Sequence, residues 1–290
     1  MLDLTTALYD NVYGISCVEN SLLAWLKFRG LPYQSLYCRS YADINTVINE
    51  FCERKLDYLG YRDMDRLQSV AQDIGLCDLS AMEIQPGKLL PVLEEVFLEG
   101  KPLFIEVDSG LLQKKFNITP RQREHGLLAY KILEGEVYLL DDYPIREIRI
   151  KPTELDKIAF RHVIVFNENS FDPDNYFNEF GHVIKCIKAF ETQQLSGEFG
   201  VDTLLFLRDA VGILRISRSR VYEWLVWMQS VYHIYIEKEC YTKLQELIRE
   251  LNRMFSVIEL YRMKGRDIAK DIPAMIAEAN RLDEAWKHAL

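Results

Sequence analysis

Apolar residues recur at helical spacing through the first hundred positions of the chain. Val18, Leu22 and Trp25 follow Ser16, a residue type that commonly caps helices, and predict a helix from Cys17 to about Phe28. A short strand is predicted at 34–39. Two or three further helices are expected in this half, over the ranges 41–54, 63–74 and 87–98.

After residue 100 the apolar period changes from helical to strand-like. The strands are predicted from short runs of apolar and β-branched residues, at 102–108, 125–133, 136–141, 145–150 and 162–167. Glu134-Gly135 reads as a tight hairpin connection, and a short helix is expected near 152–158. Helices followed by an antiparallel sheet of about five strands predict an α+β domain.

Beyond residue 170 only helical patterns remain. They predict helices at 176–193, 201–214, 218–236, 241–263 and 273–288. We therefore expect two domains, an α+β domain over 1–170 and an all-helical domain over 171–290. Four aromatic residues and one methionine lie at helical spacing in the second domain and are called the aromatic stripe here: Trp224, Trp227, Met228, Tyr232 and Tyr235. We interpret the stripe as core, or, if it is partly exposed, as the lining of an acyl channel or as a dimer face.

Composition excludes several classes of protein. The 290 residues are 49% hydrophobic and carry a net charge of −9, which argues against a nucleic-acid partner. No apolar run is long enough to span a membrane, and the first residues lack the pattern of a signal peptide. The cysteines have no paired spacing, so reduced thiols and a cytoplasmic location are expected. No cofactor is expected, and no metal either, since helical histidines such as His182 lack a ligand at the i+4 position.

Cys17 is the first candidate for chemistry. A thiol in the first turn of a helix is near unpaired backbone N–H groups, which stabilise the thiolate form that acts as a nucleophile. The alternative is that Cys17 is a small buried apolar residue, as free cysteines often are.

His125 and Asp141 are the candidate partners of Cys17. His125 begins one strand of the predicted hairpin and Asp141 ends the other, so the hairpin places them at the same end of the sheet. A carboxylate there can orient the imidazole and stabilise its charged form. Asp142 is a rival, but strand alternation points it to the opposite face.

An oxyanion hole requires two hydrogen-bond donors. The backbone N–H of Cys17 is one candidate, and the side-chain amide of Asn11, six residues upstream, is the other. Asn11 is equally well read as a turn residue after Asp10.

The order and spacing of Cys17, His125 and Asp141 resemble the papain-like cysteine peptidase fold, including the leader peptidases of bacteriocin exporters. Those peptidases have Gln where this chain has Asn11. The chain is more similar to the family named for the N-terminal domain of butirosin biosynthesis protein H. The similarity covers about residues 10–170 and is carried by three blocks: Gly14-Ile15-Ser16-Cys17 with Asn20-Ser21-Leu22, Gly100-Lys101-Pro102-Leu103 with Val107-Asp108, and His125-Gly126-Leu127 with Gly135-Glu136-Val137-Tyr138-Leu139-Leu140-Asp141.

The resemblance implies a thiol acyltransferase of natural-product biosynthesis associated with peptide synthetases. Its cysteine accepts an acyl group from an acyl or peptidyl carrier protein and passes it to an amine. Two other functions stay open: a cysteine peptidase or thioesterase that hydrolyses the same kind of intermediate, and an inactive protein whose helical half binds partners.

Overall fold

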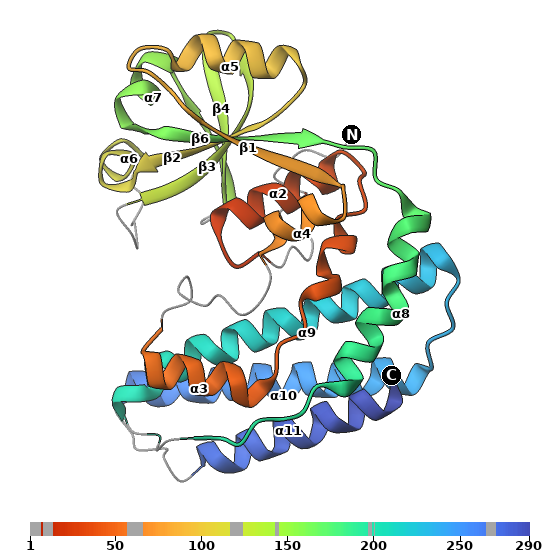
Figure 1. Ribbon diagram of the computed structural model, residues 1–290. Helices are drawn as coiled ribbons and strands as arrows, with labels where there is room; N and C mark the ends of the chain where they lie inside the picture. Colours follow the sequence, from red (N-terminus) through yellow and green to blue (C-terminus); the bar gives the residue numbers. More distant parts are fainter. Residues whose placement is uncertain are drawn as a thin grey trace. The chain divides into compact units, whose positions relative to one another are not determined.

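A computed structural model describes residues 7, 14–56, 66–116, 124–142, 145–196, 199, 201–264 and 271–290 of the chain (Figure 1). These residues form two compact units. Unit 1 comprises residues 1–33 and 67–171, and unit 2 comprises residues 34–66 and 172–290. One domain boundary was expected, near residue 170, and the chain does pass from unit 1 to unit 2 after residue 171. It also passes between the units after residues 33 and 66, because the segment 34–66 belongs to unit 2.

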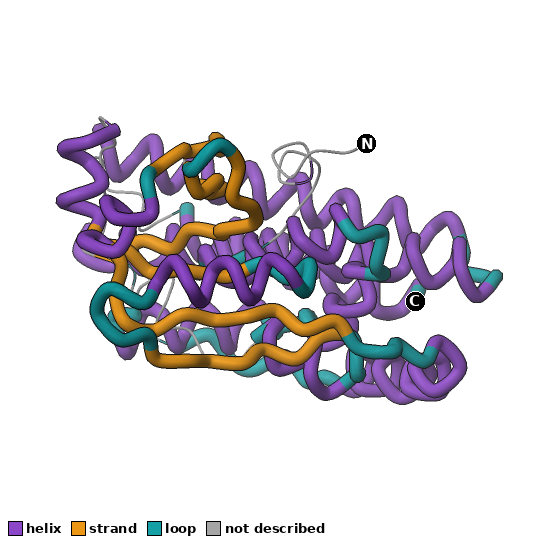
Figure 2. Tube along the Cα trace, turned by 90° about the horizontal axis from the view of Figure 1, so that it is seen from above, coloured by secondary structure: helices purple, strands orange, loops and turns teal. Residues whose placement is uncertain are grey.

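Unit 1 contains an antiparallel sheet, as predicted for an α+β chain, with strand order β1-β6-β2-β3-β4-β5. The strands lie alongside one another, coloured orange in Figure 2. Their bounds are β1 (Cys77–Glu83), β2 (Leu103–Asp108), β3 (Glu124–Leu133), β4 (Glu136–Asp142), β5 (Ile145–Ile150) and β6 (Ala159–Glu168). The helices of the unit are α2 (Cys17–Phe28), α4 (Leu67–Asp73), α5 (Leu89–Leu98), α6 (Ser109–Phe116) and α7 (Pro152–Ile158).

Helices cover both faces of this sheet. On one face, alternate strand residues such as Ile105, Leu127 and Leu139 pack against Leu93 of α5 and Leu155 of α7 in one buried apolar cluster. On the other face, α2 packs against β3 and β4 (Figure 1). Because successive strand residues alternate between faces, one set of side chains builds the core and the other set meets α2.

Unit 2 is almost entirely helical in its described part. Its elements are α3 (Ile44–Arg54), α8 (Pro173–Ala189), the short 3-10 helix η2 (Val201–Thr203), α9 (Leu204–Tyr232), α10 (Lys238–Lys264) and α11 (Ile272–Ala289). Helix α9 packs against α3 and α10, and α10 packs against α11. No helix among the described residues combines the length and apolar character needed to cross a bilayer.

Two local predictions were wrong, and one strand was missed. Residues 34–39 form part of a 3-10 helix, η1 (Tyr33–Arg39), instead of a strand. Strand β1 was missed because most of its side chains are exposed, so it has no apolar signature. Helix α9 is continuous where a break was expected between 214 and 218, because Ser217 and Arg218 are polar and yet fully buried.

Candidate active site

Cys17 is the first residue of α2, and hydrogen bonds fix the backbone around it. Ser16 caps the helix, and its Oγ accepts the backbone N–H of Glu19 at 3.3 Å. The buried Glu19 carboxylate accepts the backbone N–H of Ile15 at 2.6 Å and that of Leu67 at 3.1 Å. The helix therefore begins at a defined position, with the Cys17 thiol at its positive end and partly accessible.

Two glycines allow α2 to approach the sheet and its own preceding loop. A Cβ atom at Gly126 in β3 would lie 2.1 Å from the Phe104 ring and 3.0 Å from Cys17 Cβ. A Cβ atom at Gly14 would lie 2.1 Å from Asn20 Oδ1. No side chain fits at these distances, so both positions require glycine if Cys17 is to lie beside β3.

His125, near the start of β3, is held by Asp141, near the end of β4. The His125 Nε2 atom lies 2.8 Å from Asp141 Oδ1. Asp141 is fully buried, and its Oδ2 accepts the Nε–H of Arg146 at 3.1 Å. Asp141 and Arg146 are direct partners in the pairing of β4 with β5. The carboxylate is thus fixed from two sides, and it leaves Nδ1 of His125 for other partners.

The surroundings of His125 stabilise its charged form. Burial lowers the pKa of the imidazole, but hydrogen bonds with Asp141 and Cys17, together with the charges of these groups, raise it from 6.5 to about 10. Opposite charges close to an imidazole favour the imidazolium. His125 can therefore hold a proton at neutral pH and deliver it to a leaving group.

Asp142 is the site residue that the sequence did not predict. Its Oδ2 accepts the side-chain N–H of Asn20, on α2, at 2.8 Å. Cys17 Sγ, an imidazole nitrogen of His125 and a carboxylate oxygen of Asp142 all lie within 4.8 Å of one another. Alternation was expected to point Asp142 away from Asp141, and that other face is the one on which α2 carries Cys17.

Burial also changes the Asp142 carboxyl. Desolvation raises its pKa above the ordinary value, although the hydrogen bond from Asn20 and the charge of His125 act in the opposite direction. Its Oδ1 is buried and accepts no hydrogen bond from the described residues. This oxygen is an open acceptor in the site.

Cys17, His125 and Asp141 are therefore brought together by the structure, whereas Asn11 lies outside the described residues. Two signals for the missed features were present in the sequence. Ser16 and Glu19 have the spacing of a capping box, and Arg146 follows Asp141 closely in sequence and pairs with it between β4 and β5.

The residues considered for other functions have different surroundings. Trp224 and Met228 are fully buried, so this part of the aromatic stripe is core, and only Tyr235 is highly exposed, at 84%. His182 does have a neighbour at the i+4 position, since its Nε2 lies 3.5 Å from Cys186 Sγ on the exposed surface of α8. The expectation that it lacks one was wrong.

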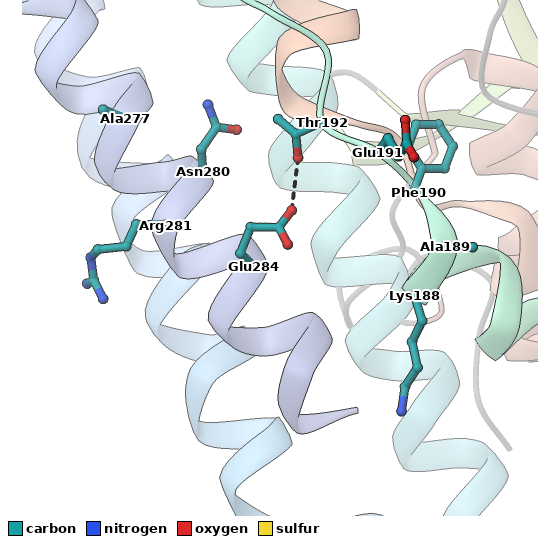
Figure 3. A pocket seen from close by; sticks show the side chains of 9 residues that line it. All are labelled: Lys188, Ala189, Phe190, Glu191, Thr192, Ala277, Asn280, Arg281 and Glu284. Atoms are coloured by element: carbon teal, nitrogen blue, oxygen red, sulfur yellow. Dashed lines mark hydrogen bonds between the residues drawn. The ribbon is translucent and has the colours of Figure 1, made fainter.

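A polar pocket of about 760 Å³ lies within unit 2, between the end of α8 and helix α11 (Figure 3). Thr192 Oγ1 donates to Glu284 Oε1 across it at 2.9 Å. The described residues that line it include no cysteine and no histidine, so this pocket offers neither a thiol nor an imidazole base.

No protein-family model and no curated protein sequence matches this chain. The basis for assigning a function is therefore the chemistry of Cys17, His125, Asp141 and Asp142.

Proposed function

We propose that this protein is a cysteine acyltransferase with a papain-like unit 1. It would move an acyl group from a carrier-protein thioester through Cys17 to an amine acceptor. One observation carries the proposal: His125 lies between the Cys17 thiol and a buried carboxylate, Asp141, which Arg146 also holds. Covalent acyl transfer needs a nucleophile, a base in contact with it and a group that orients the base, and Cys17, His125 and Asp141 would serve as these three.

The first half-reaction forms the acyl-enzyme. The Cys17 thiolate attacks the thioester carbonyl, and the backbone N–H groups at the start of α2 can stabilise the oxyanion. As the intermediate collapses, the bond to the carrier thiolate breaks, and His125 gives that thiolate its proton. Exchange of one thioester for another is nearly balanced in energy, so no strong acid is needed.

The second half-reaction releases the product. An amine attacks the acyl group on Cys17, neutral His125 takes the proton of the amine, and the Cys17 thiolate leaves. His125 returns to its charged state and Cys17 to its ionised state. Asp141 keeps the imidazole in one orientation throughout, which is why its burial supports the proposal.

The experiment that tests this function is intact mass measurement after incubation with acyl-thioester mimics of the phosphopantetheine arm. We expect one acyl adduct per chain in the wild type and none in Cys17→Ala. Cys186→Ala is the matched control, because Cys186 is an exposed thiol outside the site. An adduct that disappears in the control and persists in Cys17→Ala contradicts the proposal.

The fate of the adduct separates the candidate reactions. Faster loss of the adduct with amines than in buffer alone, with formation of the amide, supports the transferase. Loss at the same rate in buffer alone indicates a thioesterase, and efficient cleavage of peptides indicates a peptidase. Absence of an adduct with every activated ester tested leaves a protein that binds partners without catalysis.

A further inference from the structure

The three donor atoms grouped around Cys17 form a set that suits a metal ion. Cys17 Sγ, an imidazole nitrogen of His125 and a carboxylate oxygen of Asp142 lie within 4.8 Å of one another. Ligands bonded to one tetrahedral zinc ion lie roughly 3 to 4 Å apart, since zinc bonds are about 2.0 to 2.3 Å long. Small side-chain rotations are enough to bring these donors to one ion.

The groups behind these donors also fit a metal site. His125 Nε2 lies 2.8 Å from Oδ1 of the buried Asp141, and a carboxylate on one imidazole nitrogen is the arrangement found behind histidines that bind a metal through the other nitrogen. Asn20 holds one oxygen of Asp142 at 2.8 Å. The other oxygen, Oδ1, is buried and has no hydrogen-bond partner among the described residues. A cation beside it would satisfy this oxygen.

We propose that Cys17, His125 and Asp142 bind a Zn²⁺ ion reversibly and that the bound ion blocks the nucleophile. A thiolate and a carboxylate supply two negative charges, which neutralise the ion. The His125 imidazolium releases its proton to solvent when the ion binds, and its nitrogen then serves as the neutral third ligand. Sulfur and nitrogen donors favour zinc over magnesium or calcium. Three protein ligands leave a fourth position for water, as in open zinc sites, so the ion can exchange.

Zinc binding would hold the protein in an inactive state. The Cys17 sulfur cannot attack a thioester while its electron pair is bonded to the metal. This inference goes beyond the proposed function, since Asp142 has no part in acyl transfer there. The two nonetheless share Cys17 and His125, so binding and transfer are mutually exclusive.

Competition with a chromophoric chelator tests the site on the metal-free full chain. We expect one Zn²⁺ per wild-type chain and a loss of affinity of roughly 10- to 100-fold or more in Asp142→Asn. The Asn side chain has the same shape and can still accept the hydrogen bond from Asn20. Co²⁺ in place of Zn²⁺ should give sulfur-to-cobalt charge-transfer absorption in the wild type and none in Cys17→Ser. Wild-type affinity in Asp142→Asn overturns the proposal.

The matched control removes a second cysteine–histidine pair that could bind zinc, which lies on the surface of α8. His182→Ala with Cys186→Ser deletes the exposed pair on α8, whose donor atoms are 3.5 Å apart. The affinity for zinc should be unchanged in this double variant. If zinc binding is lost there and kept in Cys17→Ser, the ion belongs to the α8 pair and the proposal fails.

A measurement without variants covers the case in which Asp142→Asn does not fold. Zn²⁺ should slow the alkylation of Cys17 in the wild type, and excess chelator should restore the rate. If Zn²⁺ leaves the alkylation rate of Cys17 unchanged, the proposal that Cys17 binds zinc is wrong. Acyl adduct formation is measured in metal-free buffer, so a chain that acylates but does not bind zinc disproves only this inference. A chain that binds zinc but does not acylate disproves only the proposed function.

Discussion

Each unit of this protein contains a cluster of buried charged side chains, and the two clusters differ in how their charges are satisfied. In unit 2, Arg218 is fully buried and donates from Nε to Asp283 Oδ1 at 2.9 Å. Asp283 Oδ2 accepts the hydroxyl of Tyr41 at 2.7 Å, and Lys287 Nζ lies 3.7 Å from it. Arg218 also donates to the carbonyl of Ala42 at 2.8 Å. Both oxygens of the unit 2 carboxylate thus have partners.

In unit 1 one buried carboxylate oxygen has no hydrogen-bond partner among the described residues. Asp141 has partners on both oxygens, but the next carboxylate, Asp142, has a buried oxygen without one. Cys17 beside it is partly accessible. In the Arg218 cluster the carboxylate is fully paired and no nucleophile is present, although Arg218 Nη2 is buried without a partner among the described residues. The Cys17 cluster instead leaves a nucleophile and a carboxylate oxygen open, and such groups are available for a ligand. This difference supports a structural role for the Arg218 cluster and is consistent with the chemical role proposed for the Cys17 cluster.

The largest expected effect comes from Asp141→Asn in unit 1. The amide preserves the shape of the side chain but can donate a hydrogen bond, which favours the wrong tautomer of His125. Acylation of Cys17 should slow by roughly 10²- to 10⁴-fold while the fold is retained. Stopped-flow or mass measurement of adduct formation gives the rate, and circular dichroism reports the fold. Glu136→Gln, at the opposite end of β4, is the control; equal rates in the two variants would show that Asp141 does not orient His125.

Asp283→Ala is the corresponding change in unit 2. It leaves the Arg218 guanidinium buried without its carboxylate, which should lower the free energy of unfolding by about 3–5 kcal/mol. Chemical denaturation measures this loss. Glu284→Ala removes a neighbouring carboxylate that is 45% exposed and should have a much smaller effect. A loss for Asp283→Ala no larger than that of Glu284→Ala would remove the distinction between the clusters.

The sequence was enough to predict elements with strong local patterns. The helix from Cys17 to Phe28 has the predicted bounds because its cap, its apolar period and its terminating Gly30 agree. The hairpin of β3 and β4 likewise follows from its tight turn and apolar runs, and it places His125 beside Asp141.

Features that depend on distant packing were not predictable in this way. Asp142 belongs to the site because α2 packs on its side of the sheet, and no local pattern says which face of a sheet a helix more than a hundred residues away will cover. Ser217 is a polar residue in the apolar period of α9, so the sequence pattern indicated a break there. Its hydroxyl can be buried because it donates a hydrogen bond to the carbonyl of Ser40, far away in the sequence, at 2.6 Å. Buried polar pairs of this kind conceal helical continuity.

Gly126→Ala tests whether close approach of α2 to the sheet is required. The new methyl group would meet the ring of Phe104, which is only 2% exposed and cannot move into solvent, and would press on Cys17. We expect a loss of about 1–3 kcal/mol in the free energy of unfolding and slower alkylation of Cys17. Gly181→Ala in unit 2 is the control: a Cβ there meets nothing within 4 Å, so stability should hold or rise. Similar behaviour of the two variants would contradict the packing.

The pH dependence of acylation follows from the raised pKa of His125. Because the pKa in the folded protein, about 10, lies above 6.5, the imidazolium contributes stability that is complete below pH 6.5 and is lost as the pH rises through about 10. If acylation uses the His125 proton, its rate should fall about tenfold for each pH unit above the His125 pKa of about 10. A rate profile in a constant-ionic-strength buffer measures this limb. Continued increase of the rate above pH 10, with the fold intact, would mean that His125 does not act as the acid.

The smallest expected effect is that of Ser16→Ala at the start of α2. The substitution removes the Oγ that accepts the Glu19 backbone N–H at 3.3 Å, and the loss of such a cap costs about 1 kcal/mol of stability. The bonds of the Glu19 carboxylate to Ile15 and Leu67 remain, so the helix should still begin at Cys17. Ser16→Thr retains a capping hydroxyl and should restore most of the stability. If Ser16→Ala reduces the alkylation rate of Cys17 far more than its stability loss explains, the cap positions the thiol as well as the helix, and the division between structural and chemical groups does not hold within unit 1.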